Sequence, residues 1–233
     1  LELKGTTTQN VNMNGYAISA NLQINNPANI NLGGSAVISG AFNLVAGKIQ
    51  MNAYDLTLNG TISNTFDNTR YFITNGNGRL WRDVGVGAAN QFSFPVGADA
   101  SSYNPVTILE NQTADRYGVR CLNKAYNSGS TGDAFVKQVV DAGWVVTDAT
   151  AGGNFNVTGA WSATDELTGF NRSKTGVSKF DVQIAHHLVP HTGIEGRRRR
   201  AIEINRHLSS YHDRAKWKPT CATTTPRASP VAS

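Results

Sequence analysis

The only adjacent acidic pair before residue 181 is Asp165-Glu166. Paired carboxylates can act as acid and base, or hold Ca²⁺. Adjacent residues of a strand face opposite sides, so this pair could converge only in a loop. The following Leu167-Thr168-Gly169 favours a simple turn instead. An extracellular hydrolase or lyase acting on a polysaccharide or ester stays an alternative, with Asp55 and Asp67 as further acidic candidates and Ca²⁺ as the only cofactor suggested.

Two tryptophans, Trp81 and Trp161, are the other weak candidates for ligand binding. Together they could form a platform on which a sugar stacks, although buried core aromatics are the commoner explanation. All five histidines lie beyond residue 181, so a Ser-His or Cys-His pair within residues 1–180 is excluded. No nucleophile motif of the G-x-S-x-G type is present either. We therefore predict no catalytic residues. Whether the protein is an enzyme is left open, with a non-enzymatic function favoured.

The charge of the chain is divided unequally near residue 181. Residues 1–180 carry 12 Lys/Arg and 12 Asp/Glu, whereas residues 181–233 carry 9 basic and 4 acidic residues and so hold the net charge of +5. A neutral body cannot neutralise phosphates, so nucleic acid is an unlikely partner except through Arg197–Arg200. The histidines at 186, 187 and 191 suit a loose surface cluster better than a metal site, because adjacent residues point apart and Pro190 interrupts a helix.

The basic tail, residues 182–233, is predicted to be helical at first and then disordered from Pro219. One stripe of an amphipathic helix would contain Ala201, Ile204, Leu208, Tyr211 and Ala215. We expect this tail to add little to the stability of the body, because its charges are costly to bury unpaired. A natural extension, a reading-frame change, a cloning junction or a fusion would each explain the break in composition.

The cysteine content, the hydropathy and the N-terminal residues bear on disulfide pairing, membrane insertion and processing. With only Cys121 and Cys221, free thiols are favoured over a disulfide, and whether the two pair is left open. No run of about 18 apolar residues exists, which predicts no membrane-spanning helix. The N-terminus lacks an initiator Met and a signal-type apolar segment, so Leu1 is expected to begin a fragment or a processed product.

The first 65 residues contain a degenerate repeat with irregular spacing. Apolar and polar residues alternate in short units that end in Gly or Asn: LELKG (1–5), VNMNG (11–15), LQINN (22–26), INLGG (30–34) and LTLNG (56–60). Period two predicts strands, and stacked copies would bury their apolar faces as a β-solenoid does. An antiparallel meander is the alternative. The residues expected to be buried on a common face are Val11, Met13, Leu22, Ile24, Ile30, Leu32, Leu56 and Leu58.

Longer strand patterns follow between residues 70 and 161. The NGNG sequence at 75–78 predicts a hairpin, and turns every 8–12 residues or so favour a β-sandwich. Residues 134–147 suit either a short helix or a strand, and 155–161 suit a strand. No helix longer than about 10 residues is expected in residues 1–125, because no helical period competes with the alternation.

Residues 70–181 resemble a domain of large, repetitive secreted or cell-surface proteins of Bacteroidetes-type bacteria, which often use type IX secretion. The matching motifs are TNGNGRLWRDVG (74–85), FSFPVG (92–97), SYNPVTI (102–108) and DELTGFNRSKTGVSKFD (165–181), while LTLNGTISN (56–64) resembles the solenoid repeat before that domain. The resemblance implies a secreted or cell-surface location and a β-rich fold, and it carries over no catalytic residue. The continuation after Asp181 departs from the family pattern.

Together these patterns predict an all-β chain. Residues 1–66 would form a short β-solenoid or meander, residues 67–181 a β-sandwich-like domain, and residues 182–233 an atypical basic tail. The function expected is that of a non-catalytic fragment of a secreted or surface-exposed structural or adhesive protein. Its expected partner is a cell-surface or extracellular polymer.

Overall fold

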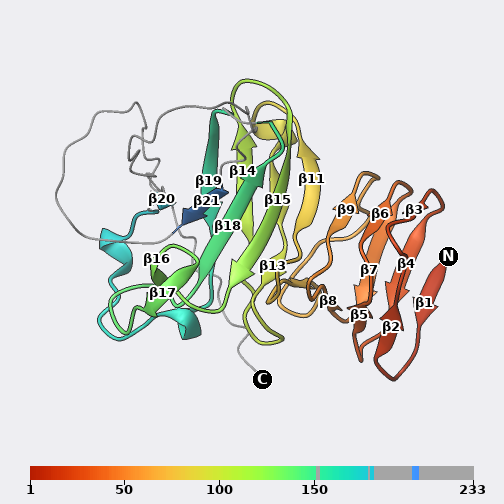
Figure 1. Ribbon diagram of the computed structural model, residues 1–233, viewed down its shortest axis with the longest axis horizontal. Coiled ribbons are helices and arrows are strands. Elements are labelled where there is room, and N and C mark those ends of the chain that lie inside the picture. Colours follow the sequence, from red (N-terminus) through yellow and green to blue (C-terminus); the bar gives the residue numbers. More distant parts are fainter. Residues whose placement is uncertain (151–152, 178, 181–200, 205–233) are drawn as a thin grey trace, which may run out of the picture.

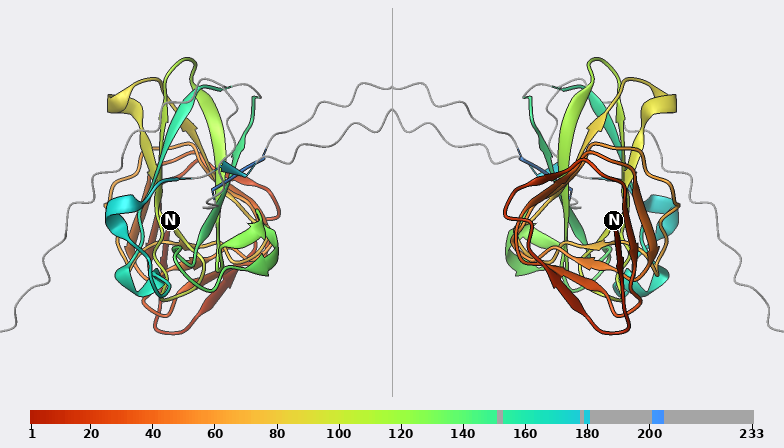
Figure 2. Two further views of the ribbon diagram at one scale, coloured as in Figure 1. Left: turned by 90° about the vertical axis from the view of Figure 1, so that its left-hand side faces the viewer. Right: turned by 90° about the vertical axis from the view of Figure 1, so that its right-hand side faces the viewer.

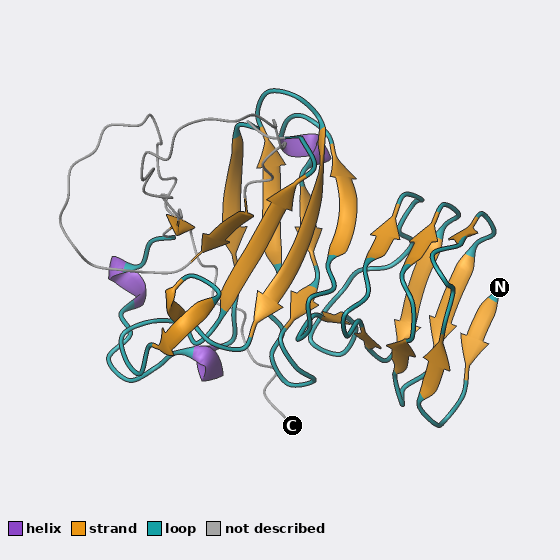
Figure 3. Ribbon diagram, viewed as in Figure 1, coloured by secondary structure: helices purple, strands orange, loops and turns teal. Residues whose placement is uncertain are grey.

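The structure, a computed structural model, describes residues 1–150, 153–177, 179–180 and 201–204. Within these ranges the regular structure is β apart from three single-turn 3-10 helices, η1 (Ala88–Asn90), η2 (Ala163–Asp165) and η3 (Arg172–Lys174) (Figure 3). The all-β prediction is confirmed, as is the expectation of no long helix in residues 1–125.

The N-terminal part is a β-solenoid with three faces of parallel strands (Figure 1). The first face contains β1 (Glu2–Lys4), β4 (Leu22–Asn25) and β7 (Phe42–Ala46). The second contains β2 (Gln9–Val11), β5 (Ile30–Leu32), β8 (Ile49–Gln50), β10 (Phe72–Ile73) and β13 (Val96–Gly97). The third contains β3 (Ala17–Ile18), β6 (Ala36–Ile38), β9 (Leu56–Leu58) and β11 (Leu80–Val84). Parallel pairing of strands from successive coils excludes the antiparallel meander for this part.

The coils share a similar length that the sequence analysis missed. Leu22 pairs with Phe42 and Ala36 with Leu56, each 20 positions apart, and Ile30 pairs with Gln9 at 21 and with Ile49 at 19. Each of the first three coils supplies one strand to each face, and from the N-terminal end the coils lie one behind another (Figure 2, right). The short units seemed irregular because neighbouring units belong to different faces of the same coil.

The interior of the solenoid collects the inward residues of all three faces. Six of the eight residues predicted to be buried are buried: Leu22, Ile24, Ile30, Leu32, Leu56 and Leu58. Val11 and Met13 are only partly buried, because they belong to the first coil, which has a neighbouring coil on one side only among the described residues. The expectation of one common face needs correcting, since three faces point these side chains into one core.

The corners of the coils explain the abundance of Asn and Gly. Asn21 accepts a hydrogen bond at Oδ1 from the N–H of Ala41 in the next coil, at 3.0 Å. Asn52 adopts φ 55°, a left-handed conformation that Asn tolerates, and donates from Nδ2 to the Leu32 carbonyl at 3.0 Å. At Gly60 a Cβ would lie 1.8 Å from the Gly40 oxygen, so the close approach of these corners requires glycine.

The predicted hairpin at 75–78 is wrong. β10 pairs with β8 and β13, and β11 pairs with β9, so the two strands that flank NGNG do not pair with each other. The turn is instead a solenoid corner, where a Cβ at Gly76 would lie 1.9 Å from the Asn52 oxygen. This coil is lengthened mainly before the corner, because Phe72 already pairs with Ile49, 23 positions earlier. The corner adds one more residue, so that Leu80 pairs with Leu56, 24 positions earlier.

The third face of the solenoid continues into an antiparallel sheet. β11 pairs in parallel with β9 and antiparallel with β15 (Asp115–Leu122), which pairs with β18 (Gly143–Asp148). β21 (Ala201–Ile204) and β20 (Lys179–Phe180) complete an eight-stranded sheet. The sheet has no break near residue 66, and the domain limits 1–66 and 67–181 stay a prediction.

A smaller sheet packs on the inner side of this antiparallel part. It contains β12 (Phe92–Phe94), β14 (Val106–Glu110) and β19 (Phe155–Gly159), and a separate hairpin contains β16 (Tyr126–Ser128) and β17 (Thr131–Ala134). Tyr117 on β15 meets Phe155 on β19 edge to face, with centroids 4.8 Å apart. The Trp144 Nε1–H on β18 donates to the Asn104 carbonyl at 2.7 Å. These contacts bury one aromatic layer between the two sheets.

The structure gives the conformation of two segments for which the sequence suggested a helix. Residues 134–147 form no helix: Ala134 ends β17, residues 143–147 belong to β18, and residues 135–142 between them form a loop, so the strand interpretation holds only for the part around Trp144. Of the helix expected from Ala201 onward, only 201–204 are described, and they form β21 beside β18. The expected histidine cluster, the Arg197–Arg200 run and Cys221 lie outside the described residues.

Candidate functional site

Trp81 projects from the outer face of the eight-stranded sheet. Its neighbour Leu80 is fully buried in the interior, and successive strand residues face opposite sides, so the half-buried Trp81 points outward. Trp81 pairs with Thr57 on β9 and with Gly118 on β15, and Gly118 pairs in turn with Thr147 on β18. One row of residues therefore crosses from the solenoid into the antiparallel strands.

The indole ring lies flat against Gly118. A Cβ at Gly118 would be 2.5–2.6 Å from three ring atoms of Trp81, including both atoms of the ring fusion. Three nearly equal distances place the ring face, not its edge, over the glycine. Gly118 thus provides the space in which the indole lies on the sheet. One face of the ring is covered by backbone, and the other is directed away from the sheet.

A shallow groove of about 280 Å³ adjoins this ring, small compared with pockets that enclose drug-sized ligands. Its lining residues are Asp55, Thr57, Trp81, Arg116, Asp148 and Ala149. Asp55 accepts a hydrogen bond at Oδ1 from the Arg79 N–H at 2.8 Å, which fixes the carboxylate. Its Oδ2, the Thr57 hydroxyl and the Trp81 Nε1–H make no hydrogen bond within the described part of the chain. The groove therefore offers oriented acceptors and donors beside an aromatic ring.

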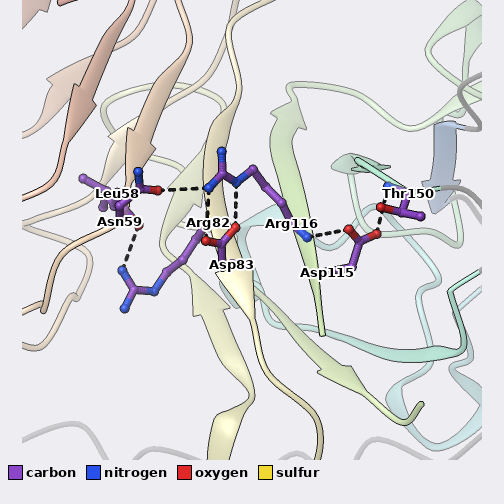
Figure 4. A network of polar contacts seen from close by, with 7 residues as sticks. All are labelled: Leu58, Asn59, Arg82, Asp83, Asp115, Arg116 and Thr150. Carbon is purple, nitrogen blue, oxygen red and sulfur yellow. Dashed lines mark hydrogen bonds and ion pairs between the residues drawn. The ribbon is translucent and has the colours of Figure 1, made fainter. Parts of the chain in front are cut away.

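Arg116 is held by contacts with both parts of the fold (Figure 4). Its Nε and Nη2 donate to the two carboxylate oxygens of Asp83 at 2.6 and 3.0 Å, and Nη2 also donates to Asn59 Oδ1 at 3.3 Å. The hydrogen bond from Arg116 holds the pKa of Asp83 below its usual value, and the same bond raises the pKa of Arg116. Arg82 donates from Nη1 to the carbonyls of Leu58 and Gly60, at 3.0 and 2.9 Å. These bonds fix the groove across the solenoid junction.

Charged groups of both signs lie around the groove, three acidic and two basic. Arg79 donates from Nε to the Thr147 hydroxyl at 3.2 Å, while its backbone N–H donates to Asp55. Arg116 is paired with Asp83, and Asp148 lines the groove at 6 % exposure. With carboxylates and guanidinium groups interleaved, the site suits hydrogen bonding to an uncharged ligand better than attraction of a strongly charged one.

The acidic pair Asp165-Glu166 lies in a different place and is engaged in local structure. Asp165 Oδ2 accepts from Asn104 Nδ2 at 2.8 Å and from the Ser162 N–H at 3.1 Å, which forms the capping box of η2. Glu166 Oε1 accepts from Trp161 Nε1 at 3.0 Å and pairs with Arg172 at 2.6 Å. The two carboxylates thus bind different partners.

The remaining candidates are also separated from the groove. Trp161 meets Phe170 edge to face at 5.9 Å and is packed against the core, so it forms no joint platform with Trp81. Asp67 pairs with Arg70 at 2.6 Å within one turn, and this hydrogen bond lowers the pKa of the Asp67 carboxyl. Of the four acidic residues named as candidates, only Asp55 lies at the groove.

Sequence reasoning missed Thr57, Arg116, Asp148 and the glycine beneath Trp81. A glycine inside a strand pattern, as in RYGVR at 116–120, is a signal for close approach of another group, but it does not identify that group. The role of Asp165 had a clearer signal, since Ser162 followed three residues later by Asp fits a helix-start motif.

Comparison of the chain with protein families, curated proteins and solved structures finds no match. Among the described residues no helix is long and apolar enough to cross a membrane, and no three His, Cys, Asp or Glu side chains group as metal ligands would.

Proposed function

We propose that this protein is a non-catalytic structural or adhesive component of a secreted or cell-surface β-protein, and that it contacts an extracellular polymer. The observation that carries the proposal is the outer face of the eight-stranded sheet, where one continuous surface bears a polar groove beside an aromatic ring. The motifs that resemble secreted repetitive proteins support the location.

The architecture supports a mechanical role. Coils that stack through backbone hydrogen bonds form a stiff solenoid. Its third face and the antiparallel strands belong to one sheet, so no flexible linker separates the two parts. We infer that the strands beyond the solenoid act as a β-sandwich-like module, and that the contact site lies where this module joins the solenoid.

The chemistry of one acidic candidate supports binding more than turnover. A general acid at neutral pH needs a raised carboxyl pKa, whereas the hydrogen bond from Arg70 lowers the pKa of the Asp67 carboxyl. Asp67 is therefore unsuited to act as a general acid.

The test combines adsorption with product analysis on the same samples. The full chain is incubated with insoluble cellulose, chitin and starch granules, with and without chelator, and depletion from solution is measured alongside new reducing ends. We expect saturable adsorption to at least one polymer and no product. Adsorption to none of them would contradict the adhesive role, and product that grows with time and disappears in Asp55→Asn would favour a hydrolase.

A further inference from the structure

We propose that the groove at Trp81 binds an uncharged sugar residue of a polysaccharide chain, with the sugar stacked on the indole. This inference rests on the proposed function and names the class of ligand. It assigns the groove, and not the Asp165-Glu166 pair or Trp161, as the place of contact.

The geometry of Trp81 supports stacking. The ring lies parallel to the sheet over Gly118, so its outward face is presented flat. Aromatic side chains combine a large apolar face with a polar edge, and a pyranose likewise has an apolar C–H face and a rim of hydroxyl groups. Because Gly118 supports the ring from below and the paired strands fix its backbone, the platform is ordered before a ligand arrives.

The polar groups beside the ring match a rim of hydroxyl groups. Asp55 Oδ2 can accept from a hydroxyl, the Thr57 hydroxyl can donate and accept, and the Trp81 Nε1–H can donate. Asp55 is held by the Arg79 N–H at its other oxygen, so its free oxygen has a fixed position. A hydrogen bond to a carboxylate is stronger than one between neutral groups, which makes Asp55 the strongest single contact expected.

The charges disfavour the other ligands that stack on tryptophan. A nucleotide or an acidic polymer would bring its anionic groups close to Asp55 and Asp148, while Arg116 is already paired with Asp83. A cationic side chain over the ring would lie close to Arg116 and Arg79. An uncharged polyhydroxyl ligand avoids both costs.

The surface next to the groove suits an extended chain. Register partners continue the row from Trp81 through Thr57 and Val37 to Ala17, one residue per coil on the outer face. These side chains are short, so the surface beside the indole is nearly flat. A linear polymer lying across the coils would thus meet a smooth track that leads to the aromatic ring.

The test is isothermal titration calorimetry of the full chain with neutral hexaoses of β-1,4-glucose, β-1,3-glucose and β-1,4-mannose. Polygalacturonate and a trimethyl-lysine peptide serve as charged comparisons. Asp55→Asn keeps an oxygen for the Arg79 N–H but replaces the free acceptor by an amide donor. Trp81→Phe shortens the platform, and Thr57→Val removes a hydroxyl without changing the shape. Trp161→Phe is the matched control, since Trp161 lies outside the groove.

We expect at least one neutral hexaose to bind, and Asp55→Asn to weaken it by about tenfold or more. Trp81→Phe should weaken binding, Thr57→Val should do so less, and Trp161→Phe should leave it unchanged, with thermal unfolding showing that each variant is folded. Stronger binding of either charged probe, or equal affinities for all variants, would overturn the inference. If the chain adsorbs to polymers while no hexaose binds, the assignment of the groove fails and the adhesive function stands. If it adsorbs to none, both fail.

Discussion

Replacing Gly60 by alanine tests the stacking of the solenoid coils. A Cβ at Gly60 would lie 1.8 Å from the oxygen and 2.5 Å from the carbon of Gly40, whereas real Cβ contacts stay beyond 3.0 Å. The two corners must therefore separate by at least the difference, 3.0 − 1.8 = 1.2 Å. That shift strains the hydrogen bonds from the N–H groups of Asn59 and Gly60 to the Ile38 carbonyl, now 2.8 and 3.2 Å.

The loss of stability in Gly60→Ala follows from the clash of its Cβ with Gly40 and from the strained hydrogen bonds. Overpacking typically costs about 1–3 kcal/mol, and a weakened backbone hydrogen bond adds about 1 kcal/mol, so Gly60→Ala should lower the free energy of unfolding by roughly 3 kcal/mol. For a chain of this size each kcal/mol corresponds to roughly 2–4 °C, which predicts a melting temperature lower by about 10 °C.

Urea unfolding followed by tryptophan fluorescence measures this difference. Gly176→Ala is the matched control, because a Cβ there meets nothing within 4 Å, and a surface change of this kind should alter stability by less than about 0.5 kcal/mol. Equal stability of the two variants would refute the argument, since it would mean that the corners at residues 40 and 60 do not approach each other as described.

Three further outcomes follow from the packing. Leu44→Ala should lower the free energy of unfolding by about 2–5 kcal/mol and Leu3→Ala by clearly less, because Leu44 is fully buried and Leu3, in the first coil, is not. Equal losses in urea unfolding would contradict a first coil that is partly open. Burial raises the pKa of Tyr117, as does its hydrogen bond to Glu110, so the stability contribution of the protonated phenol is complete below about pH 10 and declines above it. Tyr117→Phe should flatten this decline of the free energy of unfolding at alkaline pH, and an unchanged dependence on pH would refute the coupling. Burial likewise raises the pKa of the Cys121 thiol, so mass spectrometry after alkylation should find Cys121 modified only once the chain is unfolded, and rapid modification of the native chain would contradict its burial.

Local alternation in the sequence was enough to predict the β-class of the chain and six buried residues of the solenoid core. Leu22 and Ile24, for example, alternate with polar residues and are buried, because period two fixes which side chains share a face. The assignment of strands to three faces needed the period of about 20 residues. That period is obscured because consecutive units such as VNMNG and LQINN belong to different faces, and because extra residues between Ile62 and Phe72 lengthen one coil.

The groove could be predicted only in part. Trp81 and Asp55 were candidates by residue type, but their neighbours depend on strand pairing over long separations. Gly118 lies beneath the indole only because β11 and β15 pair in one register, and a shift of one residue would place a different side chain there. Arg116 reaches Asp83 through the same pairing. Such contacts leave no local pattern, so they become visible only in the folded chain.

The most direct test of the assignment follows the indole N–H signals in a ¹⁵N-labelled sample during titration with the hexaose that binds. The chain has four tryptophans, and Trp81→Phe identifies the signal of Trp81. We predict that this signal shifts progressively and saturates, while those of Trp144, whose N–H donates to Asn104, and Trp161, whose N–H donates to Glu166, stay in place. A saturating shift at Trp161 with no change at Trp81 would contradict the assignment of the groove as the ligand site.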